Sequence, residues 1–410
     1  MNDRIAARIR LRAKGRPFGR ALCAAVAVAL GLALVGCSDS GAADGAGGSG
    51  HAEGQRVTRS APATSLAGVC PATIVFQDDW WPQAETAALY RLLGEDVRVD
   101  KAKKRVSAPL VSDGADTGVR IELRAGGPAN GFTRAAKILY LDKEVMLGSA
   151  DIDLAAAASN GAQPVLPVFA PMDISPLVLM WDPRAHPEWK SIADIGKTGA
   201  RVLYFPGSTY MQYLVDAGIL RKSQVEDSYD GTPARFVAER GKVAQQGYLT
   251  NEVFQFEHEL PQWKRKVAWQ LVSDAGYPNY PAAVAIRPDR KAALAPCLEK
   301  LVPIMQRSAV AYAADPAPTN ALIVQLVKDY GAFPYSPERA AAAVATMKRY
   351  GIIGNGANKT VGDFDTARVQ KIIDILRPLL AAEKRPLKAG LRPDDIATNA
   401  FIDPRIGLPS

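Results

Sequence analysis

Three turns that follow apolar, strand-like runs carry side chains suited to holding a small molecule. They are Asp79-Trp80-Trp81, Gly148-Ser149 and Gly207-Ser208-Thr209-Tyr210. In open α/β sheets, ligands bind beyond the carboxyl ends of the strands, where helix N-termini converge. An indole stacks on a planar ligand for about 0.5–1.5 kcal/mol beyond area burial. Ser and Thr hydroxyls beside free backbone N–H groups favour an anionic or strongly accepting group.

A second set of polar and aromatic residues follows later strands and completes a ring of candidates. It consists of Tyr248, Asn251, Glu252 and Tyr277. Because aromatic side chains are frequent in the whole set, a ring-bearing ligand is favoured. The predicted ligand-binding residues are Trp80, Trp81, Ser149, Ser208, Thr209, Tyr210, Tyr248, Asn251, Glu252 and Tyr277.

Each candidate also has a purely structural interpretation. In this interpretation, Trp80 or Trp81 packs against the edge of a domain. Ser149, Ser208 and Thr209 then only cap helices, which is the commoner role of such residues. In the same interpretation, Tyr277 belongs to a Pro-rich segment that stiffens the crossing between the two domains, and Glu252 pairs with an exposed Lys.

The elements that must position these residues alternate between strand-like and helix-like segments. The alternation begins at residues 73–76, restarts near residue 177 and ends in a long helical region after residue 286. Such alternation predicts an α/β fold with mostly parallel sheets flanked by helices. We therefore expect two lobes from one chain, with a helical C-terminal region.

The N-terminus has the pattern of an export signal. Seven basic residues and one acidic residue occupy the first twenty positions, and Ala21–Val35 follows without a charge. This apolar run is shorter than the roughly 20 residues that span a bilayer. Leu34-Val35-Gly36-Cys37 then resembles the lipobox of bacterial lipoproteins. The resemblance implies a signal peptide at 1–36, lipidation of Cys37 and a protein anchored to the outer face of the cell membrane; the alternative is an uncleaved signal anchor.

The formal charge of +8 belongs mainly to this signal. Residues 37–410 keep 43 of the 50 basic and 41 of the 42 acidic residues, a net charge of +2. A nearly neutral body gives no basic surface for nucleic acid, so we expect no nucleic-acid partner. The Gly-, Ser- and Ala-rich segment 37–66 is typical of a flexible tether.

Two cysteines remain in the body, Cys70 before the first strand and Cys297 in an apolar helix. In an exported protein, two thiols predict a disulfide, here one that closes a loop of more than two hundred residues. The alternative is two independent buried thiols.

Taken together, these residues resemble the solute-binding proteins of ABC importers. The Asp79–Pro82 turn, Gly148–Ile152 after the third strand of that family, and Trp189–Ile195 are similar to the subgroup that serves thiamine-precursor pyrimidines, sulfonates, taurine and nitrate. The resemblance spans about 70–404. It implies the type II periplasmic-binding-protein fold, with lobe 1 at 67–173 and 278–410 and lobe 2 at 174–277. It also implies a monomer that captures a small organic ligand, either a pyrimidine-like heterocycle or a sulfonate-type anion, and delivers it to permease subunits.

Catalysis is the alternative function. The chain has no Gly-x-Ser-x-Gly, phosphate-binding loop or His-Glu-x-x-His motif in a supporting context. Some relatives with this fold form pyrimidines and carry a Cys-rich iron-binding run, which this chain lacks. We therefore expect no enzyme activity, no cofactor and no metal, and keep a secreted enzyme of the same fold as the alternative.

Overall fold

The computed structural model describes residues 64–409. The predicted signal peptide, Cys37 and nearly all of the predicted tether lie outside the described residues. The packed chain begins at the end of that tether, because Leu66 is fully buried and its N–H donates to the carbonyl of Thr117.

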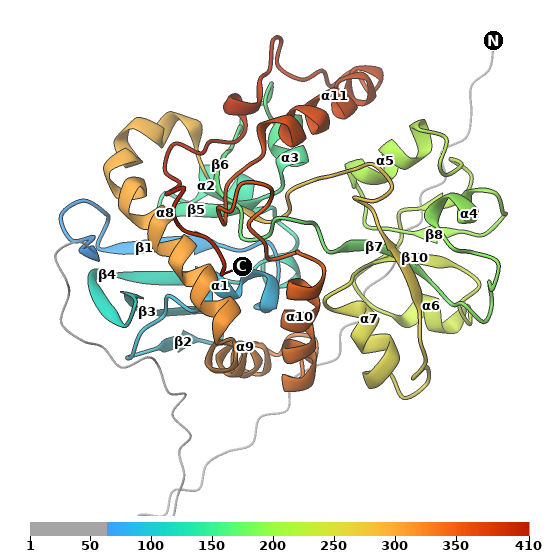
Figure 1. Ribbon diagram of the computed structural model, residues 1–410, viewed down its shortest axis with the longest axis horizontal. Helices are drawn as coiled ribbons and strands as arrows, with labels where there is room; N and C mark the ends of the chain where they lie inside the picture. Colours follow the sequence, from blue (N-terminus) through green and yellow to red (C-terminus); the bar gives the residue numbers. More distant parts are fainter. Residues whose placement is uncertain (1–63, 410) are drawn as a thin grey trace, which may run out of the picture. The chain divides into compact units, whose positions relative to one another are not determined.

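Seven strands form the first sheet, in the order β2-β3-β4-β1-β5-β12-β6. We call the part of the chain built on it the first lobe (Figure 1). The apolar run TIVF at residues 73–76 lies in its central strand, β1, and the run AVAI forms β12, which neighbours the edge strand β6. The bounds are β1 Thr73–Gln77, β2 Arg98–Asp100, β3 Arg105–Ser112, β4 Ala115–Arg124, β5 Val145–Ala150, β6 Leu166–Phe169 and β12 Ala283–Ile286.

Five strands form the second sheet, in the order β11-β7-β10-β8-β9, and the second lobe is built on it. Its strands lie between β6 and β12 in the chain, so the chain passes from the first sheet to the second and back. The bounds are β7 Leu177–Trp181, β8 Val202–Leu203, β9 Val225–Glu226, β10 Ala244–Tyr248 and β11 Ala268–Leu271.

Helices flank both sheets, as expected for an α/β chain, and the C-terminal region is helical (Figure 1). The helices of the first half are α1 Ala87–Tyr90, α2 Ala135–Leu141, α3 Ile152–Ala157, α4 Ile192–Gly196, α5 Thr209–Asp216, α6 Ala234–Ala238 and α7 Glu252–Phe254. Those of the C-terminal region are α8 Lys291–Ala314, α9 Ala317–Tyr330, α10 Pro337–Arg349 and α11 Thr366–Ala382. Short 3₁₀ segments are η2 Ala84–Thr86, η3 Gly127–Asn130, η5 Pro288–Arg290 and η6 Pro393–Asp395, and η4 Gln255–Glu259 is a π-helical turn.

The strand pairing is mixed, whereas we expected mostly parallel sheets. β1 is parallel to β4 and β5, and β8 is parallel to β10 and β9. The remaining pairs are antiparallel. For β2, β3 and β4 the reason is local, because these strands are joined by tight turns, which only antiparallel neighbours permit. At the second of these turns, Asp113 and Gly114 both have positive φ, the geometry of a two-residue hairpin.

Alternation along the central strands separates two hydrophobic cores. Ile74 and Phe76 face a core that includes buried residues of α1, α8, α9 and α10, while Val75 faces a core that includes α3 and α11. The period-two pattern is that expected of strands buried on both faces. A third core, around Phe236 and Trp263, lies in the second lobe.

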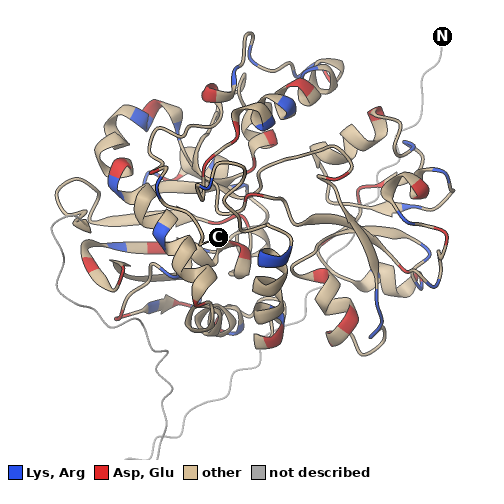
Figure 2. Cartoon of the chain, viewed as in Figure 1, with Lys and Arg blue, Asp and Glu red and all other residues tan. Residues whose placement is uncertain are grey.

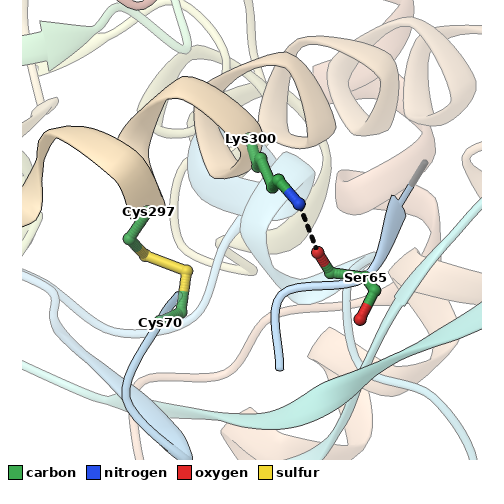
Figure 3. The surroundings of a disulfide bond; sticks show 4 residues. All are labelled: Ser65, Cys70, Cys297 and Lys300. Atoms are coloured by element: carbon green, nitrogen blue, oxygen red, sulfur yellow. Dashed lines mark hydrogen bonds between the residues drawn. A yellow bond between two sulfur atoms is a disulfide. The ribbon is translucent and has the colours of Figure 1, made fainter. Parts of the chain in front are cut away.

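The predicted disulfide is confirmed: Cys70 and Cys297 are bonded, with their Cα atoms 4.8 Å apart (Figure 3). Nearby, the Lys300 ammonium donates to the carbonyl oxygen of Ser65 at 3.2 Å. Both contacts fasten the start of the packed chain to α8, which lies more than two hundred residues later.

Candidate ligand-binding site

Two adjoining cavities are lined by residues of both lobes. The outer cavity has a volume of about 940 Å³ and the inner one about 120 Å³. We call the two together the cleft. The larger volume lies within the range of cavities that bind drug-sized ligands. The cavities share the lining residues Arg134, Asp151, Leu154, Gly207, Ser208 and Thr209.

The first lobe contributes the ends of two neighbouring parallel strands. β1 ends at Gln77 and is followed by Asp78 and Asp79, while β5 ends at Ala150 and is followed by Asp151. Because β1 and β5 are parallel neighbours, these ends lie at the same edge of the sheet. Asp79, Ser149 and Asp151 therefore line the outer cavity together.

A close approach of two loops fixes the position of Asp79. The N–H of Gly126 donates to the carbonyl of Trp80 at 2.8 Å. A Cβ at Gly126 would lie 2.2 Å from the carbonyl oxygen of Asp78, so only glycine fits against this turn.

The second lobe contributes the turn after β8 and the end of β10. Gly207, Ser208 and Thr209 line both cavities, and Tyr210 and Tyr248 line the inner one. The side-chain oxygen of Gln246 accepts from the hydroxyl of Tyr210 at 2.6 Å and from the N–H of Phe205 at 2.9 Å.

Acidic side chains gather where the first lobe lines the cleft. Asp151 accepts from the N–H of Ala282 at 2.7 Å. Burial, reinforced by the neighbouring charges of Asp153 and Asp79, raises the pKa of Asp151 to about 8. The guanidinium of Arg134 acts in the opposite direction.

Asp153 joins the lobes beside the inner cavity. Its carboxylate accepts from the hydroxyl of Thr209 and, at 2.8 Å, from the hydroxyl of Tyr277. It is 5% exposed. Two hydroxyls predicted to bind a ligand are thus bonded to a buried carboxylate in this structure.

Removing this acceptor has a measurable expected effect. In Asp153→Ala, the two hydroxyls lose a buried partner, which is expected to lower the free energy of unfolding by about 1–3 kcal/mol. Chemical denaturation of Asp153→Ala and of Asp153→Asn, which keeps an acceptor oxygen, measures the difference. An Ala variant as stable as the Asn variant would contradict this role.

The two tryptophans predicted to bind a ligand, Trp80 and Trp81, lie in different surroundings. The Trp80 ring lies 6.2 Å from that of Phe132 and 5.9 Å from that of Phe205, which belongs to the second lobe. Phe132 lines the outer cavity, is 55% exposed and has a φ of 59°. Trp81, in contrast, packs against the hydrophobic core of the first lobe.

The structure therefore brings six of the ten predicted residues to the walls of the cleft. The remaining four, Trp80, Trp81, Asn251 and Glu252, line neither cavity. The six at the walls are Ser149, Ser208, Thr209, Tyr210, Tyr248 and Tyr277. Of the hydroxyl residues considered as helix caps, Ser208 donates its hydroxyl to the carbonyl of Phe205 and makes no cap hydrogen bond to α5.

Asn251 belongs to a polar network that joins the lobes away from the cleft. The Arg339 guanidinium, on α10, donates to Asn251 at 3.1 Å and pairs with the carboxylate of Glu259. The hydroxyl of Thr250 donates to Glu85, which lies on η2. We call these residues, Glu85, Thr250, Asn251, Glu259 and Arg339, the latch network.

Glu252 lies beside the latch network and stabilises the end of β10. Its carboxylate accepts from the N–H of Tyr248 at 2.6 Å and from the hydroxyl of Tyr229 at 3.3 Å. Burial raises its pKa.

The latch network gives stability a specific pH dependence. Burial raises the pKa of Glu85 from 4.5 to about 7. The folded state thus binds more protons than the unfolded state between these values, so stability falls as pH rises from about 4.5 to 7 and then levels off. Glu85→Gln should remove this contribution of about 3 kcal/mol from the pH profile of unfolding. An unchanged profile would contradict the assignment.

Sequence reasoning missed the charged residues of the cleft, among them Asp79, Asp151, Asp153 and Arg134. Two of them stand inside motifs already singled out, Asp79 beside Trp80 and Asp151 beside Ser149. The usable signal was an Asp directly after each of two parallel strands. Arg134, the residue before α2, had no such signal.

No family model and no curated protein sequence matches the chain. Among solved structures, the alkanesulfonate-binding protein SsuA from Xanthomonas axonopodis pv. citri, bound to MOPS, is similar over 80% of this chain and 99% of its own, with 13% identity and a TM-score of 0.50. The chain has the periplasmic-binding-protein fold, type II. The aliphatic sulphonate binding protein SsuA from Escherichia coli is similar over 83% of this chain and 94% of its own, with 13% identity and a TM-score of 0.48. A Candida albicans protein with the generic periplasmic binding protein fold shows 12% identity over 82% of this chain and 98% of its own, with a TM-score of 0.46.

Two further observations apply to residues 64–409. None of their helices has the length and apolar character needed to cross a membrane. Nowhere in the same range do three or more His, Cys, Asp or Glu side chains come together in a way that would hold a metal ion.

Proposed function

We propose that this chain is the extracytoplasmic solute-binding component of an ABC importer. One observation carries the proposal: in a chain with the periplasmic-binding-protein fold, a cleft of suitable size is lined by strand ends and helix starts of both lobes. In this role the lobes divide at about 174 and 278, where the chain passes between the sheets. The crossing segments then act as a hinge.

Further parts of the proposal come from the N-terminal sequence. The signal at 1–36 exports the chain, and lipid on Cys37 holds it at the outer face of the cell membrane through the segment 37–66. As a monomer, it would deliver its ligand to membrane-embedded permease subunits. Lysines, arginines and acidic residues are interspersed over the described chain (Figure 2), in keeping with a near-neutral body.

The proposed ligand is a small organic molecule, either a pyrimidine-like heterocycle or a sulfonate-type compound such as taurine. Sulfonate binding by the Xanthomonas axonopodis protein of similar fold supports the second class. The proximity of Trp80 and Phe132 to the cleft supports a ring-bearing ligand.

A thermal-shift screen of the purified chain tests this function. The panel contains pyrimidines, thiamine precursors, alkanesulfonates, taurine and nitrate. We expect saturable stabilisation by one class, because a ligand that binds only the folded state raises its stability. Conversion of a panel compound into a product would contradict a pure binding role.

A further inference from the structure

The part of the cleft formed by the first lobe combines acidic side chains with a hydroxyl that has no hydrogen-bond partner. Asp79 and Asp151 follow neighbouring strands and line the outer cavity, and Asp151 and Asp153 line the inner one. Within residues 64–409, none of these three carboxylates forms an ion pair within 4.0 Å with Lys, Arg or His. Arg134 acts at longer range to lower the pKa of Asp79 and Asp151, and Lys137, Glu383 and Arg385 also line the outer cavity.

Ser149 provides an independent observation. Its side chain is buried, being 3% exposed, and it lines the outer cavity together with Asp79 and Asp151. Its hydroxyl lies near enough to Asp79 to lower the pKa of that carboxyl, but it makes no hydrogen bond of standard geometry. A buried polar atom without a partner is costly, so a ligand atom that bonds to it is favoured.

The surroundings favour a cation with an apolar part. The exposed ring of Phe132 lines the same cavity, and aromatic faces attract cations by about 0.5–2 kcal/mol. Arg134 extends toward the second lobe, where a Cβ at Gly207 would lie 3.6 Å from its terminal nitrogen. The Arg134 guanidinium thus borders the turn of the second lobe at Gly207, where it suits an acidic group on the same ligand.

We propose that the cleft selects a small organic ligand with a protonated nitrogen, which Asp79 and Asp151 bind by charge-assisted hydrogen bonds while the Ser149 hydroxyl accepts or donates a third. This inference rests on the proposed function and narrows its ligand class. The sequence predicted that helix starts bind an anionic group of the ligand. In this proposal, the carboxylates of Asp79 and Asp151 bind a cationic group instead. Taurine and protonated aminopyrimidines fit this class, whereas nitrate and simple alkanesulfonates do not.

Matched pairs of probes test the proposal by isothermal titration of the purified chain. The pairs are taurine with ethanesulfonate, benzylamine with benzyl alcohol, and an aminopyrimidine with its hydroxyl analogue. We expect the member with the basic nitrogen to bind about tenfold or more tightly than its partner, the value of one charge-assisted hydrogen bond. Affinity for taurine and benzylamine, whose amines stay protonated at pH 8, should also rise with pH toward about 8, because cation binding requires ionised Asp151.

Substitutions in the cleft test which residues bind the amine. Asp151→Asn keeps an oxygen for the N–H of Ala282, and Asp79→Asn is the second test; each should weaken amine binding about tenfold or more. Asp113→Asn, in the β3–β4 turn outside the cleft, is the matched control and should bind as the native chain does. Equal affinity for both members of each pair, amine binding that survives both cleft substitutions, or no binding by any amine overturns the inference. If the cleft binds only compounds without an amine, this inference is wrong but the proposed function is still supported. If the chain binds no small molecule, the proposed function is also wrong.

Discussion

Replacing Arg339 with methionine is expected to lower the free energy of unfolding by about 3–5 kcal/mol. Its side chain is buried, it pairs with Glu259 and it bonds to Asn251. Burial lowers the pKa of Arg339 to about 10, which still leaves it charged at neutral pH. Its removal leaves the carboxylate of Glu259 and that of nearby Glu85 without a compensating cation.

Arg349→Met is the matched control, since Arg349 lies on the same helix, α10, and is exposed. Its substitution should change stability by no more than about 0.5 kcal/mol, as is usual at the surface. Urea denaturation of both variants measures the two effects. Comparable losses in the two variants would show that helix α10 is sensitive in general and that the latch network adds nothing specific.

Loss of the Cys70–Cys297 disulfide is expected to lower the free energy of unfolding by about 2–5 kcal/mol. The two residues are 227 positions apart, so the bond restricts the unfolded chain over most of its described length. Cys297 is itself fully buried, and the bond attaches the segment before β1 to α8.

The measurement is thermal unfolding of the native chain and of the Cys70→Ser/Cys297→Ser variant, each with and without reductant. Reductant should destabilise the native chain to about the level of the double variant and leave the variant unchanged. If reductant lowers the stability of both chains equally, the effect lies elsewhere than in this bond.

Much of the fold could be predicted because its signals are local. Buried strands such as Thr73–Gln77 and Ala283–Ile286 are continuous apolar runs, and two cysteines in the body of an exported chain predict one bond. The β2–β3 hairpin was not predicted, because Arg98–Ser112 is rich in basic residues and contains Pro109. Without that hairpin, the first sheet seemed more parallel than it is.

Of the candidate site, only the residues at strand ends and helix starts could be predicted, because those positions are recognisable in the sequence. Ser149, Ser208 and Thr209 lie at such positions and do line the cleft. Which side chain of a turn faces the cleft depends on the fold: at the first turn Asp79 lines it and Trp81 packs inward. Arg134 reaches the cleft from a helix start that resembles any other in the sequence.

Apart from the disulfide, contacts between distant segments were beyond prediction from one sequence. Arg339 and Glu259 are 80 residues apart, and Glu85 and Thr250 are 165 apart. Nothing in the local pattern at either end indicates its partner. Asn251 and Glu252 were therefore predicted as ligand-binding residues, whereas the structure places them in and beside the latch network.

The most direct test of the central claim is a titration of the purified chain with its best ligand from the screen, after which the ligand is recovered and identified by mass. We predict one ligand bound per chain, reversibly, and recovered chemically unchanged. Recovery of a converted product, or the absence of saturable binding by any small molecule, would contradict a solute-binding role.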